Sequence, residues 1–207
     1  MNNRDYKQWA AGNYYHIYNR GNGKQDIFLD NQDYNFFLMR LRQNLFPKED
    51  YNFRTPPLPE NSFSLISYCL MPNHFHFLLR QNENVQITKL ISRLCTSYSK
   101  YFNKKHGRVG HVFQDKFKQS LVDDNKYLVW LSAYIHQNPK VAGLVKNMDD
   151  YKWSSYSEFI GSKTDTMCDR KIILSQFNSQ KLFKEFTEDS FLVTKMRKEG
   201  EHLLLDI

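Results

Sequence analysis

The chain has 207 residues, of which 41% are hydrophobic and 15% aromatic. This length is typical of one domain, or of one domain with an extension, and the apolar content excludes a mainly disordered chain. The first fifteen residues hold no apolar stretch with the length of a secretory signal, and no run elsewhere is long enough to cross a bilayer. The three cysteines show no metal-binding spacing, so we expect a protein of the reducing cytoplasm that binds no membrane.

The positive charge is concentrated in one part of the chain. The net charge is +7, and residues 86–121 hold eight basic side chains against Asp115 alone, so that stretch accounts for the whole excess. The eight are Lys89, Arg93, Lys100, Lys104, Lys105, Arg108, Lys116 and Lys118. A basic surface of this kind indicates a nucleic-acid partner. A solvated helix face is the alternative, and it is at least as common for a run of charges.

The first third of the chain alternates between strand-like and helix-like segments. Residues 14–19 are rich in aromatic and β-branched side chains and predict a strand, which runs into a glycine-bearing loop at residues 20–24. Apolar side chains recur at helical spacing over residues 31–46, which predicts a helix. Three prolines between residues 48 and 60 predict a loop, and residues 62–68 predict the next strand.

Two helices and further strands follow. Residues 74–80 predict a strand, and residues 85–106 predict an amphipathic helix whose apolar stripe lies opposite a cationic stripe of Lys89, Arg93, Lys100 and Lys104. Residues 111–122 predict one or two short strands. Residues 125–138 predict a helix that ends before Pro139, because proline disfavours helical conformation in the residue that precedes it.

This order of elements is too irregular for a doubly wound parallel sheet, and neither standard glycine-rich phosphate loop is present. We therefore expect an α+β fold, a ferredoxin-like sandwich in which helices cover one face of an antiparallel sheet. Residues 1–156 would form this domain. Residues 157–207 have balanced charge and short helix-like runs, and they would form a helical C-terminal extension.

The chemically informative residues are two histidines on a predicted strand and a tyrosine on a predicted helix. His74 and His76 are two apart, so they would project from the same face of a strand. Tyr134 and Asn138 are four apart, so they would share a face of a helix. Two imidazoles with an amide oxygen can hold a divalent metal, and the phenol beside them is a candidate nucleophile. Buried, hydrogen-bonded histidines and a tyrosine packed in the core are the alternative interpretation.

Other histidine chemistries fit the residues less well. A histidine-triad hydrolase would need a third histidine where this chain has Leu78. A two-histidine phosphoesterase would need two separate His-x-Ser/Thr motifs, and a structural zinc site would need cysteines.

Four motifs resemble, in sequence and in order, those of the single-tyrosine HUH transposases, and specifically the REP-associated branch of these IS200-like enzymes. They are Tyr15-His16-Ile17-Tyr18-Asn19-Arg20-Gly21, Met71-Pro72-Asn73-His74-Phe75-His76, Tyr134-Ile135-His136-Gln137-Asn138-Pro139 with Ala142-Gly143-Leu144-Val145, and Trp153-Ser154-Ser155-Tyr156. The resemblance covers about residues 13–156. Many insertion-sequence relatives have glutamine where this chain has Asn138.

The resemblance implies a mechanism and a substrate. Mg²⁺ or Mn²⁺ would be held by His74, His76 and Asn138, and Tyr134 would attack the scissile phosphate of single-stranded DNA. The products would be a 5′-phosphotyrosine and a free 3′-hydroxyl, which allows strands to be rejoined without ATP. The family's substrates carry imperfect hairpins, so the implied enzyme is a transposase acting in the cytoplasm, at the nucleoid, as a monomer or homodimer.

The basic residues would then bind the DNA backbone. They are Arg20, Lys24, Lys89, Arg93, Lys100, Lys104, Arg108, Lys116 and Lys118. Phe113 and Phe117 lie between these cations, where they would either stack on bases or pack in the core. Two other functions remain open: a domesticated DNA-binding protein that does not cleave, and an RNA-processing phosphoesterase.

Overall fold

A four-stranded antiparallel sheet forms the centre of the molecule, with the strand order β2-β3-β1-β4. The structure is a computed structural model that describes residues 10–48 and 56–196. The strands are β1 (Tyr14–Arg20), β2 (Phe63–Met71), β3 (His74–Gln81) and β4 (Lys118–Val122). Helix α1 (Asn31–Leu45) connects β1 to β2, and α2 (Ile87–Lys105) connects β3 to β4. This is the chain order of a ferredoxin-like sandwich, so the expected fold class is confirmed.

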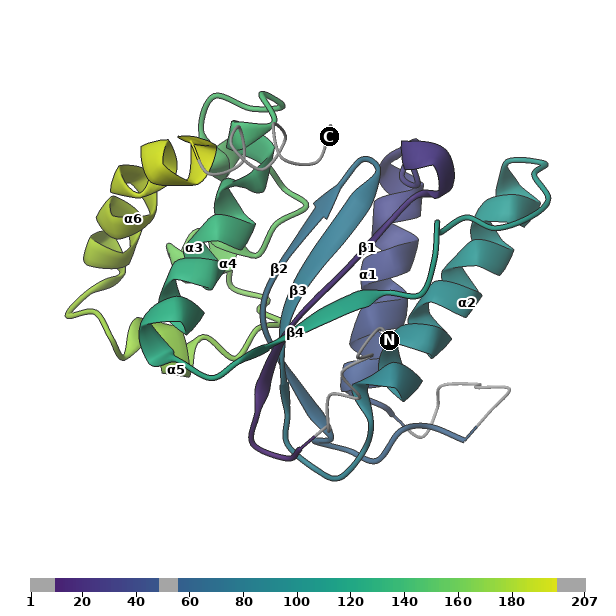
Figure 1. Cartoon of the computed structure of the whole chain (residues 1–207), viewed down its shortest axis with the longest axis horizontal. Helices are drawn as coiled ribbons and strands as arrows, with labels where there is room; N and C mark the ends of the chain where they lie inside the picture. The colour runs from purple at the N-terminus through teal and green to yellow at the C-terminus, as the bar shows by residue number, and fades with distance from the viewer. Residues whose placement is uncertain (1–9, 49–55, 197–207) are drawn as a thin grey trace, which may run out of the picture.

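Helices α1 and α2 cover one face of the sheet (Figure 1). Successive side chains of a strand point to opposite faces, and Tyr15, Ile17, Phe75 and Phe77 all point to this one. All four are fully buried. The ring of Phe37, from α1, lies 5.3 Å from that of Phe75. The two helices of the sandwich therefore lie on one face, as expected.

An additional helix, α3 (Asn125–Val141), lies against the opposite face. Figure 1 shows α3 on the other side of the sheet from α1 and α2, rising towards the turn between β2 and β3. The ring of Tyr134 on α3 meets His16 of β1 and His76 of β3 on this face. The sheet consequently has helices on both sides, and the histidine-bearing face is the one that α3 covers.

The C-terminal segments pack against α3. They include η2 (Met148–Asp150), α4 (Tyr156–Phe159), α5 (Lys171–Leu174) and α6 (Gln180–Asp189). Gln137 of α3 donates hydrogen bonds to the carbonyl of Thr187 and to the hydroxyl of Ser190. A helical extension is thus present as expected. The domain boundary after Tyr156 stays a prediction, and residues 197–207 lie outside the described part of the chain.

Short polar side chains begin the helices. The carboxylate of Asp30 accepts hydrogen bonds from the backbone N–H groups of Gln32 and Asp33, and Asp124 accepts one from Tyr127. These contacts satisfy N–H groups that have no partner within the first turn of a helix. No helix within residues 10–48 and 56–196 has both the length and the apolar character needed to span a membrane.

Three boundaries differ from those predicted. Strand β2 continues to Met71, and in the 111–122 stretch only Lys118–Val122 is a strand, while Phe113 forms a single bridge with Gly21. Helix α3 continues through Pro139 to Val141. Proline lacks the N–H that would bond the carbonyl of Ile135. The side-chain amide of Asn138 donates to that carbonyl at 3.3 Å, so the helix persists past the proline.

Candidate active site

His74 and His76 lie side by side on β3, on the face covered by α3. Their ring centroids are 5.0 Å apart and the rings are nearly perpendicular, at 88°. His74 is half-buried, whereas His76 is only 7% exposed. The strand register that the sequence predicted therefore places both imidazoles on one face.

Tyr134 lies next to this pair. Its ring centroid is 6.1 Å from that of His76, and the two rings meet edge to face at 83°. The tyrosine is half-buried, while its neighbours Ala133 and Ile135 are fully buried. The helix thus packs its apolar side chains inward and presents the phenol at the edge of the histidine site.

His16 is a third histidine at the site, and the sequence reasoning assigned it no role. Its Nε2 is 3.0 Å from Nδ1 of His76, and the two rings are stacked with centroids 5.2 Å apart. Burial lowers the pKa of His16 to about 4, so the ring is neutral at neutral pH. A neutral His16 can accept the Nδ1 proton of His76, and Nε2 is then the nitrogen of His76 that would bind a metal.

His74 has an equivalent partner. Its Nδ1 is 2.6 Å from Oδ1 of Asn73, and because this oxygen only accepts, His74 carries its proton on Nδ1. The amide of Asn73 is oriented in turn by donating to the carbonyl of Lys24. Histidine ligands of metals usually donate their second ring nitrogen to such a partner. Both imidazoles therefore have the hydrogen bonding expected of a metal ligand through Nε2.

Asn138 is fully buried on α3, one turn beyond Tyr134. Its Nδ2 donates to the carbonyls of Tyr134 and Ile135, at 2.9 and 3.3 Å. These bonds occupy Nδ2, so Oδ1 is the atom of Asn138 that would bind a metal.

The ligand types present suit a small, hard cation. Among residues 10–48 and 56–196, no three histidine, cysteine, aspartate or glutamate side chains come together as a metal site. A metal at His74 and His76 would need a further ligand of another kind, and the amide oxygen of Asn138 is of that kind. The donor set fits Mg²⁺ or Mn²⁺ with open positions for substrate oxygens.

The nine basic residues predicted to bind DNA fall into two groups. The first group lies near the histidines: Arg20 is opposite His74 in the sheet register, and Lys118 is opposite Tyr18, whose ring stacks on His76. We call Arg20, Lys24, Lys116 and Lys118 the rim cations. Lys24 is in the turn bonded to Asn73, and the backbone beside Lys116 is bonded to Asn19.

The second group belongs to α2 and lies beyond the other face of the sheet. The exposed members are Lys89, Lys100 and Lys104, while Arg93 donates to the carbonyl of Pro56. Arg108, just beyond α2, donates to Gln25. The structure therefore does not bring this stripe to the histidine site. Lys100 and Lys116 do meet, at a cavity of about 540 Å³ between α2 and residues 110–116.

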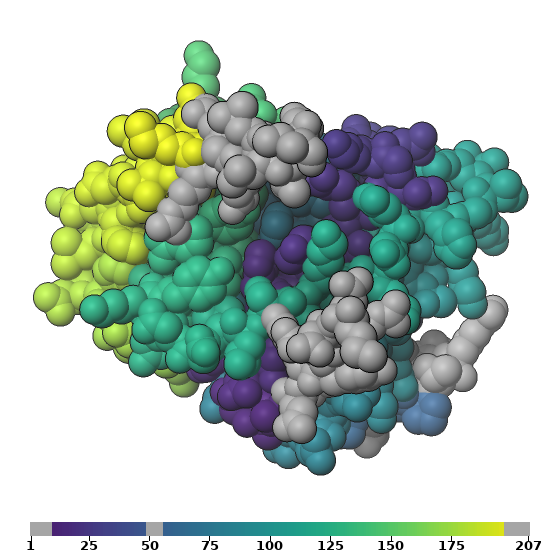
Figure 2. All heavy atoms as spheres, in the orientation of Figure 1, coloured from purple at the N-terminus to yellow at the C-terminus, as the bar shows by residue number. Residues whose placement is uncertain are grey.

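The surface near the site is concave. Figure 2 shows a hollow between the green atoms of α3 and the teal atoms of the chain leading into β4, with purple atoms of β1 visible in it. Phe113 does not contribute to that surface, because it is buried against Phe75 and Tyr98. Phe117 is partly buried and packs on the same core.

Comparison with known proteins points to a transposase family. Residues 55–138 match the family model described as "Transposase IS200 like", and this segment contains the histidine pair, the tyrosine and the asparagine of the candidate site. Over this segment the chain is similar to the IS200-like transposases. The resemblance expected from the four sequence motifs is confirmed.

Two relatives add detail to this assignment. A Haemophilus influenzae protein named as a REP-associated tyrosine transposase is 27% identical over 106 residues, a match that covers 45% of this chain and 59% of that protein. A solved REP-associated tyrosine transposase, bound to a REP hairpin, is similar in fold, with a TM-score of 0.57 at 15% identity over 76% of this chain and 85% of that one. The fold around the site is therefore that of a REP-associated transposase.

Proposed function

We propose that the protein is a metal-dependent transesterase that cleaves and rejoins single-stranded DNA through a 5′-phosphotyrosine. The observation that carries the proposal is the approach of Tyr134 to His76, at 6.1 Å between ring centroids, from a helix that covers the histidine-bearing face of the sheet. Two histidines of one strand and a tyrosine of a separate helix are thus neighbours on one face of the sheet. The similarity of residues 55–138 to the IS200-like transposases supports the same chemistry.

The metal would be Mg²⁺ or Mn²⁺, held by Nε2 of His74, Nε2 of His76 and Oδ1 of Asn138. When bound, it would polarise the scissile phosphate and offset the negative charge that develops there. His16 and Asn73 would hold the two imidazoles in the tautomer that presents Nε2. In this proposal, the protein residues bind the metal and orient its ligands.

Tyr134 would supply the nucleophile. A free phenol has a pKa of about 10, so it reacts only when its proton is removed or its target is activated. Its oxygen would form a bond to phosphorus as the bond to the 3′ oxygen breaks, and that oxygen would leave as a 3′-hydroxyl after taking up a proton. One phosphodiester-type bond replaces another, so a second strand's 3′-hydroxyl can reverse the step.

The substrate would be a single strand bearing a hairpin, such as the repeat elements that REP-associated transposases are named for. The rim cations would contact phosphates on either side of the scissile bond. The protein would act at the nucleoid, either as the transposase of a mobile element or as a domesticated form of one. Monomer and homodimer both remain compatible with this function.

The proposal is tested by incubating the protein and Mn²⁺ with labelled single-stranded DNA from the flanks of its own gene. We expect cleavage of the DNA strand that leaves a free 3′-hydroxyl, and no cleavage when EDTA is present. An all-ribose strand and a fully paired duplex of the same sequence are the controls. Cleavage of the ribose strand alone would instead support an RNA phosphoesterase, and binding without cleavage would support a domesticated DNA-binding protein.

A further inference from the structure

Three aromatic side chains form a stacked row along α3, and Tyr134 is its inner end. Tyr127, Trp130 and Tyr134 are three and four residues apart, so they share one side of the helix. The rings of Tyr127 and Trp130 are 5.7 Å apart and inclined by 18°. Those of Trp130 and Tyr134 are 5.3 Å apart and inclined by 26°. We call these three residues the aromatic row.

The row leads from the solvent to the candidate nucleophile. Tyr127 is 39% exposed, and Trp130 and Tyr134 are half-buried. At its inner end, Tyr134 meets His16 and His76 edge on. The helix anchors itself with other side chains, since Leu128, Leu131 and Ile135 are the buried ones. The row is therefore an aromatic surface that the fold displays beside the site.

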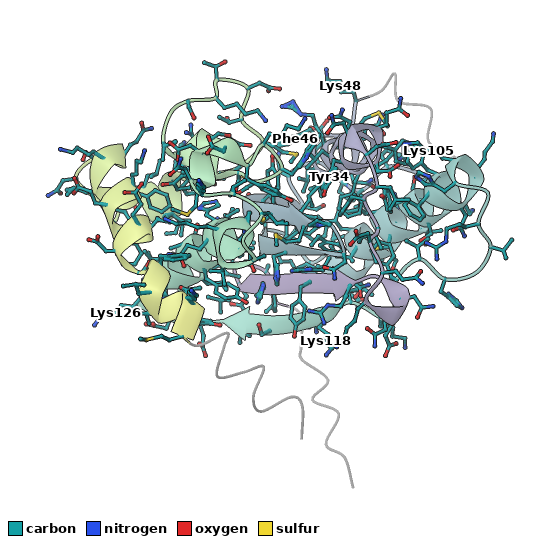
Figure 3. The ribbon with its side chains drawn as sticks, turned by 90° about the horizontal axis from the view of Figure 1, so that it is seen from above. Tyr34, Phe46, Lys48, Lys105, Lys118 and Lys126 are labelled. Atoms are coloured by element: carbon teal, nitrogen blue, oxygen red, sulfur yellow. The ribbon has the colours of Figure 1, made fainter. Side chains whose placement is uncertain are left out.

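Positive charge lies along the same side of the molecule. Lys126 precedes Tyr127 and is exposed, and Lys118 is exposed on the sheet row that contains Tyr18 and His76. Figure 3 shows both lysines on the same side of the molecule, away from Phe46. Asp124 also lies at this end of the helix, but its carboxylate accepts the backbone N–H of Tyr127. The aromatic row and the lysines beside it are chemically complementary to single-stranded DNA, in which bases are joined by phosphates.

We propose that the aromatic row is a stacking platform for the unpaired bases next to the scissile phosphate. This inference rests on the proposed function, and it specifies how the single strand reaches Tyr134. Aromatic side chains stack on any base, because every base has a π-face, and single-stranded-DNA-binding proteins combine such rings with basic grooves. A paired base has its faces covered by its neighbours in the duplex, so the platform would select unpaired DNA at the point of cleavage.

The test compares binding of two strands of equal length and charge: oligothymidylate and an abasic chain with the same phosphates. Affinities are measured by fluorescence anisotropy in a Tyr134→Phe background, so no strand is cut. The preference for bases is the ratio of the two affinities in one protein sample. A partly unfolded fraction lowers both affinities equally and leaves this ratio unchanged.

We expect the parent protein to prefer oligothymidylate, and Trp130→Ala and Tyr127→Ala to reduce that preference. Loss of one base–aromatic stack corresponds to roughly 5- to 150-fold in affinity. Trp130→Phe should retain most of the preference, since it keeps an aromatic face. Phe46→Ala is the matched control, because Phe46 is a large apolar side chain, 49% exposed, on the other side of the molecule.

An unchanged preference in both alanine variants would overturn the proposal, as would an equal loss in Phe46→Ala. A parent protein that binds both strands equally would also overturn it. Because only binding is measured, the result is independent of strand cleavage. If DNA is cleaved but the preference does not depend on the row, only the stacking platform is wrong; if the preference depends on the row but no DNA is cleaved, only the proposed chemistry is wrong.

Discussion

His16 of β1 lies beside the candidate metal ligand His76 of β3, and the hydrogen bond between their rings joins the two strands. The two residues are 60 positions apart in sequence, and their ring nitrogens are 3.0 Å apart. Since β1 and β3 are neighbours in the sheet, their shared register brings the two rings together. His16 is thus a positioning residue for His76, because a hydrogen bond to the second ring nitrogen of a histidine fixes how its other nitrogen is presented to a metal.

Replacing His16 tests this role. His16→Phe keeps a ring of similar size but removes the acceptor of the His76 Nδ1 proton, so we expect Mn²⁺ affinity to fall about 10- to 100-fold. Isothermal titration calorimetry measures this affinity without any DNA. His74→Ala should weaken binding at least as much, because it removes a ligand outright.

His111→Phe is the control for that titration, because His111 is exposed and lines the cavity beside α2. Its Mn²⁺ affinity should equal that of the wild type. If His16→Phe also binds Mn²⁺ with wild-type affinity, His16 does not orient the ligand. A His74→Ala variant with wild-type affinity would contradict the metal site itself.

At the scale of elements, the sheet separates the basic residues into two groups. Helix α2 packs on the face made by Phe75 and Phe77, whereas His74 and His76 face α3. Among the rim cations, the sheet register places Arg20 opposite His74, and Lys118 opposite Tyr18 on the row that contains His76. The α2 stripe can contact bound DNA only where the DNA continues past the edge of the β-sheet.

This arrangement predicts different salt dependence for the two groups. With a strand of about ten nucleotides, within the range covered by one binding fold, neutralising Arg20 and Lys118 to Gln should flatten the slope of log affinity against log salt. The expected change is about 0.7 for each lost phosphate contact. Neutralising Lys89, Arg93, Lys100 and Lys104 should alter the slope only for longer strands that carry the hairpin.

Titrations at several salt concentrations measure both slopes. If the four-residue α2 variant keeps the wild-type slope with the long strand, the stripe is a solvated helix face. The short DNA gives a second check. If the four-residue α2 variant flattens the salt slope for the short DNA and the Arg20 and Lys118 variant does not, the DNA path inferred from the rim cations is wrong.

Lys105 is a useful contrast within the same basic stretch. Its ammonium is 2.6 Å from a carboxylate oxygen of Asp30 and 2.9 Å from one of Asp33, so it joins α2 to the start of α1. Asp33 is fully buried and also bonds His106. Part of the charge that composition alone attributes to nucleic-acid binding therefore stabilises the packing of the two helices.

At the scale of the whole molecule, the helix that carries Tyr134 is held on two sides. The sheet lies on one side, and the C-terminal segments lie on the other. Gln137 bonds Thr187 and Ser190, and Nε2 of His136 is 2.8 Å from the hydroxyl of Ser155. Within this part of α3, Tyr134 faces the histidines, while His136 and Gln137 anchor the helix. A nucleophile needs such a fixed support, because catalysis depends on its position to within a fraction of an ångström.

The sequence predicted the parts of the site that depend on local periodicity. Spacing of two placed His74 and His76 on one strand face, and spacing of four placed Tyr134 and Asn138 on one helix face. It could not reveal the partner of His76, because the pairing of β1 with β3 is a long-range contact. The sequence also could not predict which side of the sheet α3 covers. Periodicity identifies the apolar stripe of a helix but not the surface against which that stripe packs.

Helix α3 also shows a limit of local rules. Pro139 predicted the end of the helix, yet the helix runs to Val141, because the side chain of Asn138 bonds the carbonyl that the proline leaves without a partner. The same amide is the candidate third metal ligand. Its two functions are compatible, since the helix uses Nδ2 and a metal would use Oδ1.

The central claim is that Tyr134 attacks the DNA strand, and the most direct test is to locate the covalent bond. The protein is incubated with single-stranded DNA and Mn²⁺, the adduct is isolated on a denaturing gel, and its peptides are mapped by mass spectrometry. We expect a nucleotide linked through its 5′ phosphate to the peptide containing Tyr134.

Tyr134→Phe should abolish the adduct with little loss of stability, since it removes one oxygen and hardly any volume. Tyr101→Phe, a half-buried tyrosine on α2, should form it normally. An adduct that persists in Tyr134→Phe, or that maps to another residue, would contradict the mechanism.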